Sequence, residues 1–384
     1  MRRTIVAGVV FGLLATACAV DDEPEILSFD RPGVLPAGPS ALTDRDNGDL
    51  PSPQIDLEAL VSGGPPPDGI PAIDAPKFRS IEDAELSLDE TEPVIVVDID
   101  GDARAYPVEI MMWHEIVNDV VGDVPVAITY CPLCNSAVTY ERTINDVAVT
   151  FGTSGELYAS ALVMYDRSTE SLWTHFDGRA IAGVLTGHKL EPVSSPLLAW
   201  SEFKAVHPDG RVLSRDTGFS RQYGRNPYYG YDDPDTPPFF LRSDVDERAT
   251  VKQRVVGVEI GGEAVAFPLD EIRGGEARAT VASVGDTPIV IFWLAGQNSA
   301  LEDADTSKGR DVGSVGVFRI ENELTAFRAE GSAFVDLSTA SEWDITGRAV
   351  SGPLAGDRLP VVPHLDTFWF AWSTYQPETT LFER

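Results

Sequence analysis

The chain has 384 residues, of which 29 are Lys or Arg and 61 are Asp or Glu, so its formal net charge at pH 7 is −32. A surface this acidic repels polyanions, which excludes proteins that bind nucleic acid or anionic lipid surfaces through charge. The length allows one large domain or two ordinary ones, and the apolar content is ample for a core.

The N-terminus has the parts of an export signal. Arg2 and Arg3 precede a short apolar run, residues 5–14, that is too short for a stable membrane span. Small residues then lead to Cys18 in a pattern that resembles a bacterial lipobox, although Ala15 stands where Leu is usual. We expect residues 1–17 to be removed and Cys18 to carry a lipid, which anchors the chain to the membrane on the extracytoplasmic side of the bacterial cell envelope. Ordinary secretion and an uncleaved anchor are the alternatives.

The following stretch, residues 18–76, is acidic and rich in Pro and Gly and has no sustained apolar period, so we expect a disordered tether. From residue 77 onward, short β-like runs bounded by turn residues predict a mostly β (β-rich α+β) fold with few short helices. The clearest helix signal is PVEIMMWHEIVND, residues 107–119, in which Ile110, Trp113, His114 and Val117 share a face at helical spacing.

Just before this helix, DIDGDARAYPVE, residues 98–109, places acidic residues at EF-hand-like spacing. Ala103 stands where such a loop needs Gly, and Pro107 lies inside it. We therefore expect a β-hairpin that turns at Asp100 and Gly101 rather than a calcium site.

The stretch AITYCPLCNSA, residues 127–137, holds Cys131 and Cys134, two of only three cysteines. A disulfide across so short a loop removes little chain entropy, about 2 kcal/mol, and is often strained. An exported CxxC that follows a strand also suggests thiol–disulfide exchange. Against exchange, the residues after Cys134 look strand-like rather than helical, and no Lys or Arg lies within several residues of either thiol.

Cys-Pro-x-Cys also resembles the knuckle turn of rubredoxins and zinc ribbons. In such a turn backbone N–H groups point at the first sulfur, and the residue after the second Cys, here Asn135, has a positive φ. One knuckle supplies two ligands, a tetrahedral site needs more, and the chain has no second CxxC.

The third ligand that we expect is His114, which precedes the strand that leads to Cys131, and the further candidates are His175 and Met164. A Cys₂His site with an open position suits Zn²⁺, and an added Met would favour copper. The alternative for His114 is a helix-face histidine bonded to Asn118 or to a carbonyl group.

Later in the chain, RQYGRNPYYGYD, residues 221–232, is a loop crowded with aromatic and basic side chains. Such a loop can present these groups to a ligand, or its tyrosines can pin it onto the sheet. The candidate ligand-binding residues are Arg221, Tyr223, Arg225, Asn226 and Tyr228.

Several motifs recur with a slowly drifting offset, which predicts two homologous β-rich units, residues 77–250 and 251–384. The second unit is shorter, and we expect it to lack much of the region between Phe151 and Trp173. In the alignment of the two copies Cys131 falls opposite Leu294 and Cys134 opposite Gln297, while NSA is kept. We therefore expect a similar turn to form in the second unit without thiols, and the cysteines to serve chemistry that is specific to the first.

Seven stretches carry a family resemblance: GGPPPDGIPAIDAPKF, ARAYPVEIMMWHEIVND, TYCPLCNSA, FGTSGELYAS, LVMYDRSTESLW, GRAIAGVLTGHKL and DTGFSRQYGRNPYYGYD. In this order they resemble the hallmarks of the prokaryotic domain-of-unknown-function family number 3179, from about Gly63 to Glu383. The resemblance implies that His114 and the CPLC segment belong to one family pattern, and it implies no activity. At His175 the family pattern more usually has Gln, which weakens His175 as a ligand.

The sequence therefore predicts an exported, lipid-anchored protein with one Zn or Cu ion held by Cys131, Cys134 and His114. Two alternatives are a thiol–disulfide oxidoreductase that uses the same cysteines and a binding or scaffold lipoprotein that uses the loop 221–232. The sequence shows no phosphate-binding loop, so we expect no nucleotide cofactor. Whether the protein is an enzyme is left open at this point.

Overall fold

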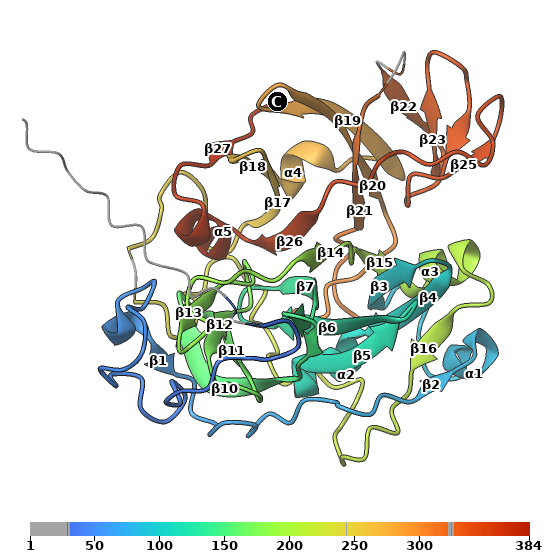
Figure 1. The fold of residues 1–384 in the computed structure, drawn as a ribbon. Coiled ribbons are helices and arrows are strands. Elements are labelled where there is room, and N and C mark those ends of the chain that lie inside the picture. Colours follow the sequence, from blue (N-terminus) through green and yellow to red (C-terminus); the bar gives the residue numbers. More distant parts are fainter. Residues whose placement is uncertain (1–28, 30, 243, 322–323, 325) are drawn as a thin grey trace, which may run out of the picture.

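The computed structural model of the protein describes residues 29, 31–242, 244–321, 324 and 326–384 (Figure 1). Strands predominate and the helices are few and short, which confirms the predicted mostly β class. No helix within these residues is long and apolar enough to cross a membrane. Cys18 and the export signal lie outside the described residues, so their assignment stays a prediction.

The first unit contains three main sheets and one small hairpin, drawn in blue to green in Figure 1. The first sheet has the order β15 (Leu197–Ala199), β3 (Pro93–Ile99), β4 (Asp102–Pro107), β16 (Arg211–Leu213) and β2 (Phe78–Arg79). The second has the order β14 (Pro192–Val193), β7 (Ser136–Glu141), β6 (Val124–Cys131) and β5 (Ile116–Val121). The third has the order β1 (Val61–Ser62), β10 (Phe151–Tyr158), β11 (Ala161–Asp166), β12 (Leu172–Thr174) and β13 (Ala180–Ala182). The small hairpin pairs β8 (Thr143–Ile144) with β9 (Val147–Ala148), and the helices of this part are η1 (Leu57–Ala59), α1 (Ile81–Glu85), α2 (Val108–His114) and α3 (Trp200–Val206).

The second unit, drawn in gold to red, also contains three sheets. The first has the order β26 (His364–Phe368), β17 (Arg254–Ile260), β18 (Glu263–Pro268) and β27 (Thr380–Leu381). The second has the order β19 (Ala277–Val284), β20 (Thr287–Leu294) and β21 (Ser314–Arg319). The third has the order β22 (Phe327–Glu330), β23 (Ala333–Asp336), β24 (Glu342–Trp343) and β25 (Ala349–Ser351). Its helices are α4 (Leu269–Ile272) and α5 (Trp369–Tyr375).

The two units repeat one order of elements. After β2 and α1, which only the first unit has, each has a hairpin and a short helix, continues with two sheets, and ends with a strand, a helix and a strand parallel to the second strand of that hairpin. The hairpin β22–β23 occupies the place of β10–β11, so the second unit keeps this region in shortened form rather than lacking it. The common ancestry of the two units stays a prediction.

One buried network recurs in the same place in both units. The Asp166 carboxylate accepts hydrogen bonds from the Thr169 amide (2.6 Å), the Thr169 hydroxyl (2.7 Å) and Trp173 Nε1 (3.0 Å). In the second unit Asp336 accepts the same three bonds, from Thr339 (2.6 and 2.8 Å) and Trp343 (3.1 Å). A buried carboxylate with several donors fixes the turn around it.

The hairpin predicted at Asp100 and Gly101 is present. Ile99 pairs with Asp102, and both turn residues have positive φ, 53° and 86°, as a tight two-residue hairpin turn requires.

The helix after this hairpin is shorter than predicted, because α2 ends at His114. Glu115 adopts φ 58° and breaks the helical run, and Ile116 and Val117 lie in strand β5, paired with β6. The β-branched pair suits a buried central strand better than a further helical turn.

The structure also differs from the expected tether. Described residues of the stretch 31–76 lie against the first unit: β1 pairs with β10, Ala41 and Ile73 are buried, and Asp68 forms an ion pair with Arg167 (3.0 Å). Specific apolar and charged contacts of this kind are not visible in a composition dominated by Pro, Gly and Asp.

The two units share one core. A single buried cluster includes Tyr130 and Trp173 of the first unit together with Phe368 and Trp372 of the second. Strand β26 lies along β7, and the long connection 214–253 runs between the units (Figure 1). This connection carries the Tyr- and Arg-rich loop to the end of β6, where the cysteines lie.

Candidate thiol site

The cysteines lie in the turn between β6 and β7. Cys131 is the last residue of β6 and Ser136 the first of β7, and the two face each other in the strand register. Asn135 has φ 50°, as expected for a knuckle turn, and its side chain accepts a hydrogen bond from the Tyr130 hydroxyl (3.2 Å). Both cysteines are free thiols and buried.

The Cys131 sulfur is surrounded by hydrogen-bond donors. Burial by itself raises the pKa of this thiol, but bonds from the Cys134 thiol and from the amides of Cys134, Leu162 and Leu133 outweigh it and lower the pKa. Cys131 is the thiol whose anion this turn stabilises.

The Cys134 sulfur has the opposite environment. Burial raises its pKa well above the usual value, and the hydrogen bond and charge of Cys131 raise it further. Its sulfur lies 2.9 Å from Ser136 Oγ, which lies 2.7 Å from His175 Nε2. His175 Nδ1 in turn lies 2.8 Å from Thr129 Oγ1.

The hydrogen bonds among Thr129, His175 and Ser136 have only one consistent assignment of donors and acceptors. The Thr129 hydroxyl donates to the Val138 carbonyl oxygen (2.6 Å), so its oxygen accepts from His175 Nδ1–H. Nε2 is then the acceptor nitrogen of His175 and takes the Ser136 hydroxyl proton. The single Cys134 thiol proton has two possible acceptors, the Cys131 sulfur and the Ser136 oxygen. When Ser136 accepts it, Ser136 connects that thiol to the neutral imidazole.

His175 is held in its neutral form. Its side chain is fully buried, and burial lowers its pKa to about 3, which the neighbouring Ser136 offsets only in part. A buried imidazole in this form serves as a hydrogen-bond acceptor for Ser136 at neutral pH.

His114, the last residue of α2, is already bonded at both nitrogens. Nδ1 lies 2.7 Å from the Pro71 carbonyl oxygen, to which it donates, and Nε2 lies 2.7 Å from the Tyr223 hydroxyl. Burial lowers the pKa of His114. The carbonyl bond is the one expected for a helix-face histidine, whereas Asn118 bonds to Asp74 and Phe151 instead.

Glu115, which the sequence did not single out, is a buried carboxyl next to Cys131. Its backbone carbonyl accepts the Tyr130 amide (2.8 Å), which places it beside the end of β6. Burial raises the pKa of Glu115 well above its usual value, and the charge of Cys131 adds to this effect. Burial therefore favours the protonated form of Glu115 beside the Cys131 thiol.

The connection 214–253 covers the turn. The Tyr231 hydroxyl donates to the Leu133 carbonyl oxygen between the two cysteines (2.9 Å), and the Tyr223 hydroxyl meets His114. Tyr228 packs against the core cluster that includes both cysteines, and burial, Glu115 and Cys131 raise its pKa. The expectation that tyrosines pin this loop onto the sheet agrees with these contacts.

The other predicted residues of the loop and the core have separate places. Asn226 is buried and donates to the Asp303 carbonyl oxygen (3.0 Å). Arg221 and Arg225 are exposed, and the Arg225 carbonyl oxygen accepts from Trp113 Nε1 (3.2 Å). Met164 is buried in the same core cluster as the cysteines, with its Cα opposite Thr153 and Trp173. Within the described residues, no three or more His, Cys, Asp and Glu side chains are grouped so that they could hold a metal ion.

The second unit does not repeat the turn. Leu294 ends β20 as Cys131 ends β6, but β21 begins only at Ser314, so residues 295–313 replace the four-residue turn. The NSA sequence lies inside this longer loop, where Ser299 donates to the buried Asp232 carboxylate. The expectation that a similar turn forms there without thiols is wrong.

The longer loop of the second unit, residues 295–313, is hydrogen-bonded to the connection that covers the cysteine turn of the first unit. The amides of Asn226 and Gly230 donate to the carbonyl oxygens of Ala304 (3.1 Å) and Glu302 (3.1 Å). Asp232 forms ion pairs with Arg254 (3.0 Å) and Arg310 (3.0 Å), and its carboxylate is fully buried. The loop 295–313 thus fixes the segment that lies over the cysteines.

The sequence alone did not identify Ser136, Thr129, Glu115 or Tyr231 as parts of the site. The one local signal was Ser136, which follows Cys134 by two residues at the start of a strand. His175 was identified only as a ligand candidate, because its partners come from other strands of the fold.

The comparisons with known proteins agree with the motifs. The sequence model of the family described as "Protein of unknown function (DUF3179)" matches residues 67–379, which include both units and the whole thiol site. No curated protein and no solved structure matches the chain. Because the match covers most of the sequence, the chain belongs to the DUF3179 family.

Proposed function

We propose that Cys131 and Cys134 are a redox-active dithiol that exchanges electrons with a partner disulfide or dithiol. The observation that carries the proposal is the opposite environment of the two sulfurs. Cys131 accepts hydrogen bonds that favour its thiolate, whereas Cys134 is protonated and joined through Ser136 to the neutral His175. A nucleophilic thiolate beside a protonated second thiol is the arrangement that stepwise disulfide exchange requires.

The exchange has two steps. The Cys131 thiolate attacks one sulfur of a partner disulfide, and the other partner sulfur leaves as a thiolate. Cys134 then attacks the Cys131 sulfur, a Cys131–Cys134 disulfide forms, and the second partner sulfur is released as a thiol. The Cys134 proton passes to the leaving partner sulfur, because His175, whose pKa burial lowers to about 3, does not hold it. Ser136 is hydrogen-bonded to the Cys134 sulfur, and the Glu115 carboxyl is the neighbouring acid for Cys131. The partner gains two electrons and the dithiol loses two.

Access to the thiols requires movement of the cover. Cys131 is 2% exposed and Cys134 is fully buried, and Tyr231 bonds directly to the turn. The proposal therefore includes opening of the connection 214–253 before the partner reaches Cys131. Bonds between a loop and a turn of this kind are among the contacts that open locally without global unfolding.

The test is thiol counting combined with elemental analysis on untagged protein purified without chelators. The proposal expects two titratable thiols after reduction, an intramolecular disulfide after mild oxidation, and much less than one metal ion per chain. Metal-free protein whose thiols never form the Cys131–Cys134 disulfide contradicts the proposal.

A metal centre is the second candidate, and the observation that favours it is the knuckle turn itself. Its amides lower the pKa of the Cys131 thiol and Asn135 has a positive φ, as expected for a turn that binds a metal through two cysteines. A Cys₂His centre requires His114 Nε2 to exchange the Tyr223 hydroxyl for the metal. It expects about one Zn or Cu ion per chain, thiols that react only after chelation, and loss of the ion on Cys131→Ser substitution.

We further propose that the chain is exported and held at the cell envelope by a lipid on Cys18. The support is the basic start, the short apolar run and the small residues before Cys18. Metabolic labelling with a radioactive fatty acid tests this proposal: wild-type protein takes up label and Cys18→Ala protein does not. Equal labelling of the two, or none, contradicts it.

A further inference from the structure

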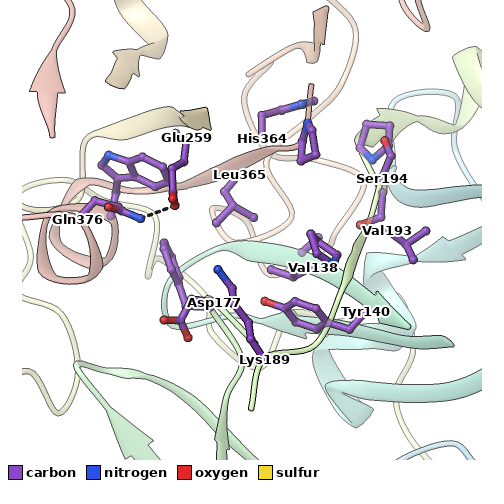
Figure 2. Close-up of a pocket in the computed structure, with 18 residues that line it drawn as sticks. Val138, Tyr140, Asp177, Lys189, Val193, Ser194, Glu259, His364, Leu365 and Gln376 are labelled. Carbon is purple, nitrogen blue, oxygen red and sulfur yellow. Dashed lines mark hydrogen bonds between the residues drawn. The ribbon is translucent and has the colours of Figure 1, made fainter. Parts of the chain in front are cut away.

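A pocket of about 280 Å³ lies between the two units, away from the buried thiols. One wall comes from β7 and residues 189–196 of the first unit, and the other from β17, β26 and α5 of the second (Figure 2). The volume is at the small end of the range for pockets that bind organic ligands, which limits an occupant to about one ring.

The walls of the pocket present apolar surface. Tyr140 and Trp372 line it, but the Tyr140 hydroxyl donates to the His175 carbonyl oxygen (3.0 Å) and Trp372 Nε1 donates to Thr379 Oγ1 (2.8 Å). Both residues therefore offer ring surface rather than free hydrogen-bonding groups. Val138, Leu365 and Phe176 complete the apolar lining. An apolar body of a ligand gains contact area here.

One cation faces this space from the first unit. Of the five lysines in the chain, Lys77, Lys204 and Lys308 form ion pairs and Lys252 donates to the Tyr231 carbonyl oxygen. Lys189 is exposed and has no hydrogen-bond or ion-pair partner among the described residues. Figure 2 shows its ammonium reaching into the pocket.

Glu259 and His364 line the same space from the second unit. The exposed Glu259 carboxylate accepts a hydrogen bond from Gln376 Nε2 (2.7 Å) and has no cationic partner among the described residues. His364 donates from Nδ1 to the Val362 carbonyl oxygen (3.0 Å), so its Nε2 is an acceptor, and this atom is buried without a partner. The remaining acid, Asp177, already pairs with Arg179 (3.5 Å).

We propose that this pocket binds a small zwitterion with an apolar side chain, of the size of one amino acid. The ligand carboxylate meets Lys189 of the first unit, and its ammonium meets Glu259 of the second. The side chain of the ligand lies between the rings of Tyr140 and Trp372. Each charge of the ligand then faces an opposite or accepting group, and no charge is left unpaired in an apolar pocket. The site is incomplete without both units, and it is independent of the proposed thiol chemistry.

The experiment is titration calorimetry with three probes: L-phenylalanine, 3-phenylpropionate, which lacks the ammonium, and 2-phenylethylamine, which lacks the carboxylate. Wild-type protein is expected to bind L-phenylalanine about tenfold more tightly than either truncated probe. Lys189→Met is expected to remove the advantage over 2-phenylethylamine. Glu259→Gln, which keeps an oxygen for Gln376, is expected to remove the advantage over 3-phenylpropionate.

Three results would overturn the proposal: no binding of L-phenylalanine to the wild type, equal binding of a truncated probe, or unchanged binding to both variants. The titrations are run on fully reduced protein and repeated on Cys131→Ala protein. Binding that is the same in both shows that the pocket functions apart from the thiols, so either proposal can fail without the other.

Discussion

The two units have the same order of elements and the same buried Asp–Thr–Trp network, and they differ most at one connection. In the first unit, β6 and β7 are joined by the four-residue turn that contains Cys134, with Cys131 at its edge. In the second, β20 and β21 are joined by residues 295–313, which contain no cysteine and hold the segment that covers that turn. Under the proposed function, the shared frame supplies stability, one connection carries the redox-active thiols, and the other holds the segment that covers them.

The largest expected effect comes from the two thiols, which exist only in the first unit. Cys131→Ala is expected to slow reaction with oxidised glutathione at least about 100-fold, because the stabilised thiolate is lost. Cys134→Ala is expected to react and then accumulate glutathione on Cys131, because the second thiol is needed for release. Mass spectrometry of the quenched reaction measures both outcomes.

The control for these two variants is the thermal unfolding midpoint of each reduced protein, which should stay close to that of the wild type. Glutathione on Cys134, or equal loss of rate in the two variants, contradicts the assignment of roles.

The second effect concerns the network that the two units share. Asp166→Asn and Asp336→Asn each replace a buried carboxylate, which accepts hydrogen bonds from the Thr amide, the Thr hydroxyl and the Trp indole, with a neutral amide. We expect each substitution to lower the free energy of unfolding by about 3 kcal/mol. Only Asp166→Asn is expected to change the rate of thiol exchange, since the Cys131 sulfur accepts the Leu162 amide from the same strand. Denaturant unfolding and exchange kinetics on both variants test this difference. A stability cost confined to one variant argues against equivalent frames.

The third effect is a pH dependence that belongs to the first unit. Burial lowers the pKa of His175 to about 3 in the folded protein, whereas in the unfolded chain it is about 6.5. As the pH falls below 6.5, the unfolded state binds a proton that the folded state does not, so stability is lost progressively down to about pH 3. Between pH 7 and pH 5 this loss amounts to about 2 kcal/mol.

His175→Gln is the matched variant, because Gln can still accept from Ser136 and does not titrate. The difference between the unfolding free energies of wild type and variant should shift by about 2 kcal/mol between pH 7 and pH 5. Taking the difference cancels the opposite contributions of Glu92 and Glu202, whose pKa burial raises to about 7. A difference that does not change with pH means that His175 is not held neutral.

The smallest effect concerns the cover. Tyr231→Phe removes the hydrogen bond to the Leu133 carbonyl oxygen and is expected to cost about 1 kcal/mol of stability. If the cover limits access, the same change raises the alkylation rate of Cys131 by about fivefold, since the closed state is favoured less. Tyr229→Phe is the control, because Tyr229 is 70% exposed and lies in the same loop. Equal alkylation rates in the two variants mean that the cover does not control access.

The sequence predicted the parts of the fold that depend on local chemistry. The hairpin at Asp100 and Gly101, the strand after Cys134 and the positive φ of Asn135 follow from the turn preferences of Asp, Gly and Asn. The helix before Glu115 was predicted too long, because helical periodicity in residues 107–119 does not reveal that Ile116 and Val117 pair with β6.

The candidate site was predicted only where its residues are neighbours in the chain. The cysteines were identified from their spacing, but His175 contributes through Ser136 and Thr129, which lie on two other strands. The bond between Tyr231 and Leu133 and the loop that holds Tyr231 in place depend on the packing of both units. Contacts of this kind arise from tertiary packing, which spacing along one sequence does not encode.

The most direct test of the central claim is a redox titration of wild-type protein in buffers of defined thiol–disulfide ratio. The fraction of the Cys131–Cys134 disulfide is measured by mass spectrometry after acid quenching and alkylation, and the fold is followed by near-ultraviolet circular dichroism. A redox-active Cys131–Cys134 dithiol is expected to show one reversible two-electron transition with the fold retained. A protein that forms no such disulfide at any ratio, or forms it only on unfolding, would contradict the account.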